Sequence, residues 1–586
     1  MKCDTLIRGG TIYDGKGGEA YTADVAITDG KISFIGDYTG SATREVSAKD
    51  LMVTPGFVDL HTHYDGQISW DDKLEPSVYH GVTTVVLGNC GVGFAPVHSE
   101  DRMRLIELME GVEDIPGTAL YEGLKWNWES FPEYMDAIDA QPHTLDFAMY
   151  VPHDPLRVYV MRDRGIAEEE ATEEDCQQMA KLLREALEAG AIGFSTGRSD
   201  VHRSTKGEWT PSSEATEKEL VALAEGLASM DQGVLQAVSD FNLERGPQDF
   251  DGEFRLIERF VQAAKRPISI SLMQRDMAPN QWRDIIMRST KSELPIFFQV
   301  APRGIGTMLG LAGTFHPLMA FPSYIEIAHL SLAERVALLR EPQRRARILQ
   351  ESPVQLSGEG TSIPPIVDAL FKQLDQVSKK LFILGRNPSY EQPFTESIYA
   401  KALQRGVSPL ECMYDALLEE EGNALLYFPI YNYTEGSFDN VRTMLTHPKS
   451  LPGLSDGGAH VGVICDASFP SYLLSYWTRD RKEGLLPIPW VIQFLTQRPA
   501  QFLGLSDRGI LEVGKKADIN VIDYERLSLT APRMVYDLPS GAARLIQKSD
   551  GFIATFVSGE QVIKDSLLCP SRPGRLVRAS QRKQND

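Results

Sequence analysis

The feature that most constrains the fold is a series of short apolar runs that alternate with helical patterns through the middle of the chain. There are eight runs, at residues 53–63, 82–90, 144–154, 191–198, 233–240, 266–274, 295–304 and 451–460. Between them, residues 173–190 and 254–265 show the apolar spacing of amphipathic helices. Eight short buried strands joined by helices predict an α/β fold, a (β/α)8 TIM-type barrel, whose functional site lies at the C-terminal strand ends.

The two ends of the chain differ from this middle region. Residues 1–52 alternate apolar residues with Gly and Asp turns, and the same pattern returns over 505–566. We therefore expect a small β-sandwich domain built from both termini, and a barrel over 53–504. Because the interval of about 305–450 is too long for one crossover, it predicts a helical insertion before the last barrel strand, covering the site. Residues 567–586 form a Pro/Arg-rich tail that should wrap the surface or fray.

Composition narrows the classes of function. Of the 586 residues, 42% are hydrophobic and 24% charged, as in globular enzymes, and no apolar stretch is long enough to span a membrane. The start of the chain lacks a signal-peptide layout, so we expect a cytoplasmic protein. A net charge of −22 disfavours nucleic acid and membrane partners. The six cysteines form no CxxC pair, which argues against disulfides, and a homo-oligomer is left open.

The segment GFVDLHTHYDG places two histidines where the first apolar run ends. Side chains at i and i+2 of a strand point the same way, so His61 and His63 should project together toward the barrel axis. Two converging imidazoles suit zinc or a related divalent metal. On spacing alone, two hydrogen-bonded polar histidines are an equally good interpretation.

Together with four further motifs, this segment resembles the N-acyl-D-amino-acid deacylase (D-aminoacylase) family of the amidohydrolase superfamily. The motifs are GVTTVVLGNCGVGFAP (81–96), GAIGFSTG (190–197), SDGG (455–458) and RGILEVGKKADINVID (508–523). The resemblance implies a metal-dependent hydrolase of amide bonds on a (β/α)8 barrel. It also implies that His61, His63 and Cys90 bind metal, and that Asp456 is both a ligand and the general base.

Each of the two added residues has a physical rationale and an alternative. Cys90 ends the second run, beside the first in a barrel, and a metal would deprotonate its thiol; otherwise it is a buried core cysteine. Asp456 ends the last run, which closes the barrel beside the first. Its carboxylate could take a proton from metal-activated water, or it could simply be a turn residue before Gly457.

The sequence departs from the family at the fifth and sixth strands, where relatives place two more metal histidines. Ala237 occupies the first of these positions, and the family's Ser-His-x-Lys becomes Ser271-Leu272-Met273-Gln274. No histidine occurs anywhere in 233–274. A single zinc ion held by His61, His63, Asp456 and Cys90 is therefore the simplest site, with iron or manganese as alternatives.

Other polar residues follow the predicted strands. His460, four residues after Asp456, could bind metal, orient Asp456 or protonate the leaving nitrogen, or it could bond only to backbone. Candidate substrate-binding residues come after the third, fourth, sixth and seventh runs: His153, Arg198, His202, Gln274 and Arg303. Each arginine could equally be structural. The aromatic stretch 121–134 could wall an acyl pocket or belong to the core.

These observations predict hydrolysis of a linear amide in a small molecule, of the N-acyl-D-amino-acid deacylase type. A cyclic-amide hydrolase resembling hydantoinase or dihydroorotase is an alternative. It is disfavoured because those enzymes use a carboxylated lysine and 191–198 ends without one. A catalytically lapsed barrel that acts as a binding protein is a third hypothesis. The missing histidines favour it, and the intact HTH, Cys90 and SDGG set opposes it.

Overall fold

The computed structural model describes residues 2–199, 201–230, 232–241, 249–358, 361, 363 and 365–579. Eight parallel strands form one sheet in chain order: β6 (Phe57–Asp59), β7 (Val82–Leu87), β8 (Asp146–Pro152), β9 (Gly193–Arg198), β10 (Val234–Ser239), β11 (Ile268–Ser271), β12 (Ile296–Val300) and β16 (Ser450–Pro452). The sheet curls until the segment after β16 meets the segment after β6. There the Asp456 N–H donates to the His61 carbonyl at 3.1 Å and the His63 N–H to the Gly457 carbonyl at 2.8 Å. The predicted barrel is confirmed.

Helices surround the strands. They are α1 (Arg102–Glu113), α2 (Gly117–Gly123), α3 (Phe131–Asp139), α4 (His153–Met161), α5 (Asp163–Ile166), α6 (Glu173–Glu188), α7 (Glu217–Ala228), α8 (Phe250–Ala264), α9 (Gln281–Ser292), α18 (Phe469–Ser475), α19 (Ile488–Leu495) and α20 (Gln497–Phe502). Helix α6 shows how the sequence specifies them. Thr172 and Asp175 form a capping box at its start, and Met179, Leu183 and Leu187 bury one face.

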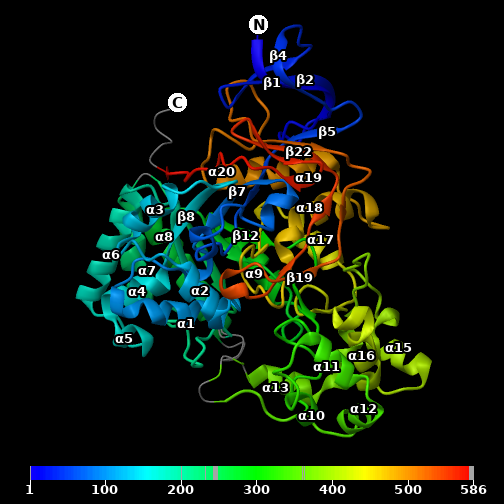
Figure 1. The fold of residues 1–586 in the computed structure, drawn as a ribbon. Helices are drawn as coiled ribbons and strands as arrows, with labels where there is room; N and C mark the ends of the chain where they lie inside the picture. The colour runs from blue at the N-terminus through cyan, green and yellow to red at the C-terminus, as the bar shows by residue number, and fades with distance from the viewer. Residues whose placement is uncertain are drawn as a thin grey trace.

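Both termini build a single nine-stranded sheet, which confirms the predicted β-rich terminal domain (Figure 1). It contains β1 (Lys2–Ile12), β2 (Tyr21–Thr28), β3 (Lys31–Gly36), β4 (Ser41–Ser47), β5 (Met52–Pro55), β17 (Ile519–Ile522), β22 (Phe552–Val557), β23 (Glu560–Lys564) and β24 (Leu567–Leu568). The first apolar run is divided between β5 and β6, so the change of sheet falls at Gly56 rather than after residue 52. A Cβ at Gly56 would lie 2.2 Å from Thr83 Oγ1, which explains the glycine.

The long interval between β12 and β16 is an insertion with a core of its own, centred on Leu339, Ile398, Met413 and Leu417. It contains β13 (Gly306–Leu309), α10 (Pro322–Ile325), α11 (Leu332–Leu339), α12 (Pro342–Ile348), α13 (Pro365–Lys372), α14 (Leu374–Val377), β14 (Phe382–Ile383), α15 (Ile398–Arg405), α16 (Pro409–Leu417), β15 (Leu426–Pro429) and α17 (Asp439–Leu445). The expected helices are present, together with a three-stranded sheet, β13–β15–β14, that the sequence analysis did not identify. Figure 1 shows α10–α16 at the opposite end of the molecule from the terminal sheet.

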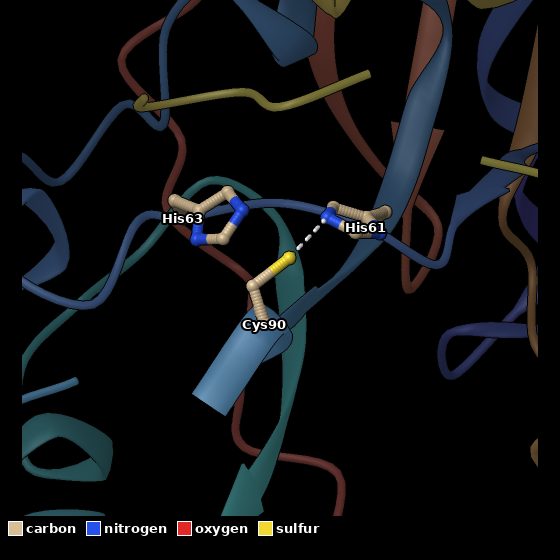
Figure 2. A group of neighbouring side chains, drawn as sticks. All are labelled: His61, His63 and Cys90. Carbon is tan, nitrogen blue, oxygen red and sulfur yellow. Dashed lines mark hydrogen bonds between the residues drawn. The ribbon is translucent and has the colours of Figure 1, made fainter. Parts of the chain in front are cut away.

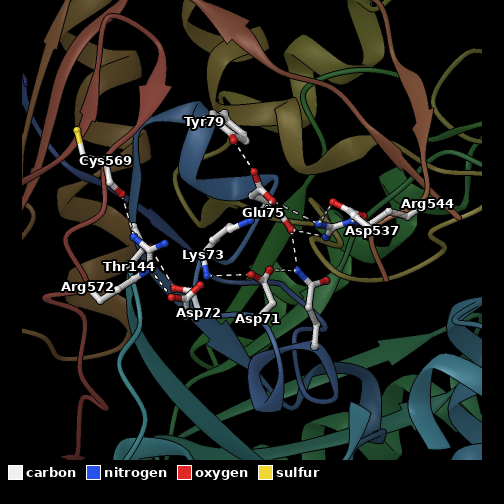
Figure 3. Close-up of polar contacts among 11 residues, drawn as sticks. Asp71, Asp72, Lys73, Glu75, Tyr79, Thr144, Asp537, Arg544, Cys569 and Arg572 are labelled. Atoms are coloured by element: carbon white, nitrogen blue, oxygen red, sulfur yellow. Dashed lines mark hydrogen bonds and ion pairs between the residues drawn. The ribbon is translucent and has the colours of Figure 1, made fainter. Parts of the chain in front are cut away.

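A polar network joins the loop after the first barrel strand to the C-terminal part of the chain (Figure 3). Arg544 pairs with Asp537 at 2.7 Å and donates to the Glu75 carbonyl at 3.0 Å. Arg572 pairs with Asp72 at 2.8 Å. These contacts hold the closing segments against the barrel. Within the described part of the chain, no helix has both the length and the apolar character required to cross a bilayer.

Candidate metal centre

Three side chains converge where β6 and β7 end (Figure 2). The ligand atoms of His61, His63 and Cys90 all lie within 4.8 Å of one another, and all three residues are buried. His61 Nε2 is 3.2 Å from Cys90 Sγ, and the two imidazole rings are 5.2 Å apart between centroids. The HTH pair therefore points inward as the strand periodicity predicts, and the cysteine of the second strand reaches the same point.

Asp456 completes the group from the loop after β16. Its Oδ1 lies 3.3 Å from His61 Nε2 and 4.0 Å from His63 Nε2. This oxygen is buried and has no hydrogen-bond partner among the described residues, and burial raises the pKa of the carboxyl to about 7. Leaving a buried polar atom unpaired costs about 1–3 kcal/mol, so the position fits a bound cation. Two imidazoles, a thiolate and a carboxylate are a donor set that suits zinc.

The backbone at this site is strained. Cys90, Asp456 and His460 have φ of +56°, +48° and +48°, in the left-handed region that favours glycine. Each such residue costs on the order of 1–3 kcal/mol and persists only where surrounding contacts fix it. Here the strained backbone orients the side chains of these three candidate site residues toward one small volume.

The ring orientation of His61 is fixed by an amide behind it. His61 Nδ1 lies 2.5 Å from Gln299 Oε1, and Gln299 Nε2 donates to Ser269 Oγ at 2.9 Å. Since an amide oxygen only accepts, Nδ1 carries the proton and Nε2 keeps its lone pair toward the cluster. Burial lowers the pKa of His61 to about 4, so the imidazole is neutral, as a metal ligand must be.

Glu113, which the sequence analysis missed, faces His63 from the other side, although His63 Nδ1 has no hydrogen-bond partner among the described residues. It is the last residue of α1 and is buried, with Oε1 3.3 Å from His63 Nδ1 and Oε2 3.4 Å from His460 Nε2. A carboxylate behind a histidine ligand orients the ring and raises its basicity. The sequence contains one weak indication that Glu113 has a special role, because an acidic residue at the C-terminal end of a helix interacts unfavourably with the helix dipole.

The fifth and sixth strands place neutral polar groups inside the barrel where relatives were expected to hold histidines. Gln236 Oε1 accepts from the Cys90 N–H at 2.8 Å, and Ser269 supports Gln299. Ala237 and Leu272 pack in the main apolar core. These strands therefore support the ligand candidates of the first and second strands, His61 and Cys90.

Four of the five candidate substrate-binding residues contact acidic side chains of the protein itself. Arg198 pairs with Glu253 at 2.6 Å, and Arg303 with Asp466 at 2.9 Å. The other two pairings are His153 Nε2 to Glu219 Oε1 at 2.8 Å, and Gln274 Nε2 to the Glu435 carboxylate at 2.9 Å. Each of these four side chains therefore has a contact within the fold, and its part in substrate binding stays a prediction.

His202 differs from this group. It is half-buried, and its charge contributes to lowering the pKa of both His63 and His460, so it lies close to the cluster. The aromatic stretch belongs to the core: Trp128, Phe131 and Tyr134 are buried in it, and the Tyr134 hydroxyl donates to the Asp65 carbonyl at 2.7 Å. These aromatic side chains therefore support the HTHYDG loop, residues 61–66, from the side of the core.

A parallel eight-stranded barrel that gathers histidine, cysteine and aspartate at the C-terminal ends of its strands is the architecture of a metal-dependent hydrolase. The comparisons with known proteins agree. Residues 44–563 match the model of the Amidohydrolase family. The chain belongs to the D-aminoacylase family of amidohydrolases, and it is a hydrolase of carbon–nitrogen bonds other than peptide bonds.

The similarity runs along the whole chain. D-aminoacylase of Alcaligenes xylosoxydans xylosoxydans is 33% identical over 98% of this chain and 97% of that protein. N-acyl-D-glutamate deacylase of the same organism is 35% identical over the same shares. Among solved structures, a D-aminoacylase mutant in complex with copper chloride superposes with a TM-score of 0.64, at 22% identity, over 98% of this chain and 100% of that one. N-acyl-D-glutamate deacylase from Bordetella bronchiseptica, complexed with zinc and a phosphonate inhibitor, gives 0.62, at 22% identity, over 99% and 100%. These two structures support the fold.

Proposed function

We propose that the protein hydrolyses N-acylated D-amino acids, with one zinc ion held by His61, His63, Cys90 and Asp456. The observation that carries the proposal is the position of Asp456. Its buried Oδ1, unpartnered within the described residues, lies within 4.0 Å of both HTH imidazoles. The full-length relatives named for cleavage of N-acyl-D-amino acids support the substrate class.

The residues of the site have separate tasks in this proposal. A divalent metal held by these residues would polarise the amide carbonyl and lower the pKa of water, so that hydroxide is available for the attack. Asp456, whose Oδ1 faces both imidazoles, accepts the proton of the attacking water and returns it to the departing amine. Burial lowers the pKa of His460 to about 3, so its neutral imidazole serves as a hydrogen-bonding group toward substrate rather than as the acid. His202 borders the same space.

The test combines metal analysis with a substrate screen. Purified protein should contain close to one equivalent of divalent metal, and His61→Ala should lose it. His98→Ala should keep it, because His98 stacks on Tyr159 at 3.8 Å on the surface side of the barrel. The protein should release free amino acid from N-acetyl-D-amino acids much faster than from their L-forms. Metal-free wild type would reject the site, and metal-loaded protein inactive on every N-acyl amide would reject the substrate class.

A further inference from the structure

A largely apolar cavity of about 400 Å³ lies between the barrel mouth and the insertion. Its walls come from three places: the loops after β9, β10 and β11, the small sheet of the insertion, and helices α13 and α14. The lining residues used below are Val201, Arg275, Met277, Leu309, Leu370 and Val377. Nothing in the proposed reaction accounts for an apolar space of this size.

Segments that form the walls of the cavity also contact segments that carry residues of the candidate metal centre. Met308, between two lining residues, donates its N–H to the Val463 carbonyl at 2.6 Å, three residues from His460. Asp114, next to Glu113, accepts from Thr314 Oγ1 at 3.0 Å and from the Gly462 N–H at 3.1 Å. On the opposite wall Val201 precedes His202 directly. A ligand in the cavity therefore lies alongside the segments that carry the site.

One wall of the cavity carries three charged residues, Arg275, Asp240 and Asp276. Arg275 is only 4% exposed and pairs with Asp240 at 2.7 Å, but its Nη1 has no hydrogen-bond partner among the described residues. At the surface Met277 is 61% exposed and lines the cavity. Asp240 pairs with Arg275, and Asp276 pairs with Lys380 at 2.7 Å, so the charges of this wall are balanced. The rest of the space is mostly apolar and suits an alkyl chain.

The size of the cavity indicates which apolar part of an N-acyl amino acid it holds, the amino-acid side chain or the acyl chain. A cavity of about 150 Å³ is enough to hold a benzene molecule. The 400 Å³ found here is more than twice that, so a single aromatic amino-acid side chain would leave most of it empty. A long acyl chain would fill it.

We propose that the substrates are long-chain N-acyl amino acids, whose alkyl chain occupies this cavity. The inference rests on the proposed function and adds the acyl group to it. Burial of each methylene contributes about a fourfold gain in binding. We therefore expect kcat/KM to rise at least tenfold from an N-butanoyl to an N-dodecanoyl D-amino acid, mainly through KM.

A variant that fills the cavity tests this expectation. Val377, at the end of α14, is half-buried in the wall, and Val377→Trp should abolish the advantage of the long chain, so that N-dodecanoyl and N-butanoyl substrates are hydrolysed with similar kcat/KM. Leu403→Trp is the matched control, since Leu403 is 65% exposed on α15 of the same insertion and does not line the cavity. It should keep the wild-type dependence on chain length.

Binding provides a readout that is independent of hydrolysis. Calorimetric titration below the micelle concentration should show dodecanoate binding at least tenfold tighter than butanoate, with Val377→Trp but not Leu403→Trp weakening it. Hydrolysis of N-butanoyl substrates with no gain from dodecanoyl, together with equal binding of the two fatty acids, would overturn the inference and leave the proposed function standing. Tight dodecanoate binding without hydrolysis of any N-acyl amide would reject the proposed function and keep the cavity as an alkyl-chain site.

Discussion

At the scale of single residues, the site separates into ligand candidates and the groups that aim them. His61, His63, Cys90 and Asp456 have atoms that face one another, whereas Gln299 and Glu113 stand behind the two imidazoles. Glu113 is the more unusual of the supports because it touches two histidines at once. One carboxylate thereby links a proposed ligand, His63, to a residue of the substrate space, His460.

Replacing this carboxylate should weaken metal binding without removing a ligand. Glu113→Gln keeps the shape but removes the carboxyl group that faces His63 Nδ1, and loss of such support typically lowers metal affinity 10- to 100-fold. Titration against a chromophoric chelator would measure the loss. Glu107→Gln is a suitable control, because Glu107 lies on the same helix and pairs with Lys206 at the surface. Equal metal affinity in both variants would show that Glu113 has no part in holding the metal.

A second buried carboxyl, away from the metal centre, makes stability depend on pH. Burial raises the pKa of Asp154 from its ordinary 3.8 to about 7, while Oδ1 accepts from the Ser212 N–H at 2.7 Å. Because the folded-state pKa is the higher one, the stabilisation is complete below pH 3.8 and is lost as the pH rises toward 7. The total loss is up to about 4 kcal/mol, since each pH unit between the two pKa values is worth about 1.4 kcal/mol.

Asp154→Asn keeps the acceptor and removes the charge. Its melting temperature should match that of the wild type at pH 4 and exceed it at pH 8. Asp163→Asn, a change at a side chain that is 85% exposed, should show no such divergence. An offset between Asp154→Asn and the wild type that is the same at both pH values would contradict the assignment.

The ligand candidates could be predicted because each lies in a recognisable local pattern. His61 and His63 are two residues apart on a strand, and Cys90 and Asp456 lie in sequence motifs. The residues that support them lie in no such pattern. Gln299 lies 238 residues from His61 in sequence, so only the closure of the barrel reveals their contact. The ion pairs of Arg198 and Arg303 were hidden in the same way, since their acidic partners, Glu253 and Asp466, lie on distant segments of the chain.

At the scale of elements, every barrel strand was predictable because its apolar run is continuous and bounded by turn residues. The boundary between the two sheets was not, since β5 and β6 are equally apolar and a single residue, Gly56, separates them. The small sheet of the insertion could not be predicted from the sequence for a different reason. β14 has only two residues and β13 and β15 four each, too few for an alternating pattern to stand out. That sheet nevertheless supplies a wall of the apolar cavity, so the unpredicted element is the one that shapes the proposed acyl site.

At the scale of the whole molecule, the ends of the chain hold the barrel from outside. The terminal sheet joins residues from both ends, and the segment after it runs back along the barrel. The Val577 N–H donates to the Phe147 carbonyl at 2.7 Å and the Ala579 N–H to the Gly190 carbonyl at 2.9 Å. The predicted tail therefore wraps the surface as far as residue 579, with Leu576 only 4% exposed in the main apolar core.

A charged side chain in place of Leu576 should destabilise the barrel as well as release the C-terminal segment. Leu576→Asp would either bury a carboxylate beside Phe147 or release the segment and expose the apolar surface beneath it, and both outcomes cost about 2–4 kcal/mol. We expect a melting temperature several degrees lower and faster proteolysis within the barrel. Leu567→Asp, where the side chain is 69% exposed, controls for the added charge and should melt like the wild type. If Leu576→Asp instead loses only its tail to protease and keeps the wild-type melting temperature, the segment is an appendage and the terminal domain alone carries the closing contacts.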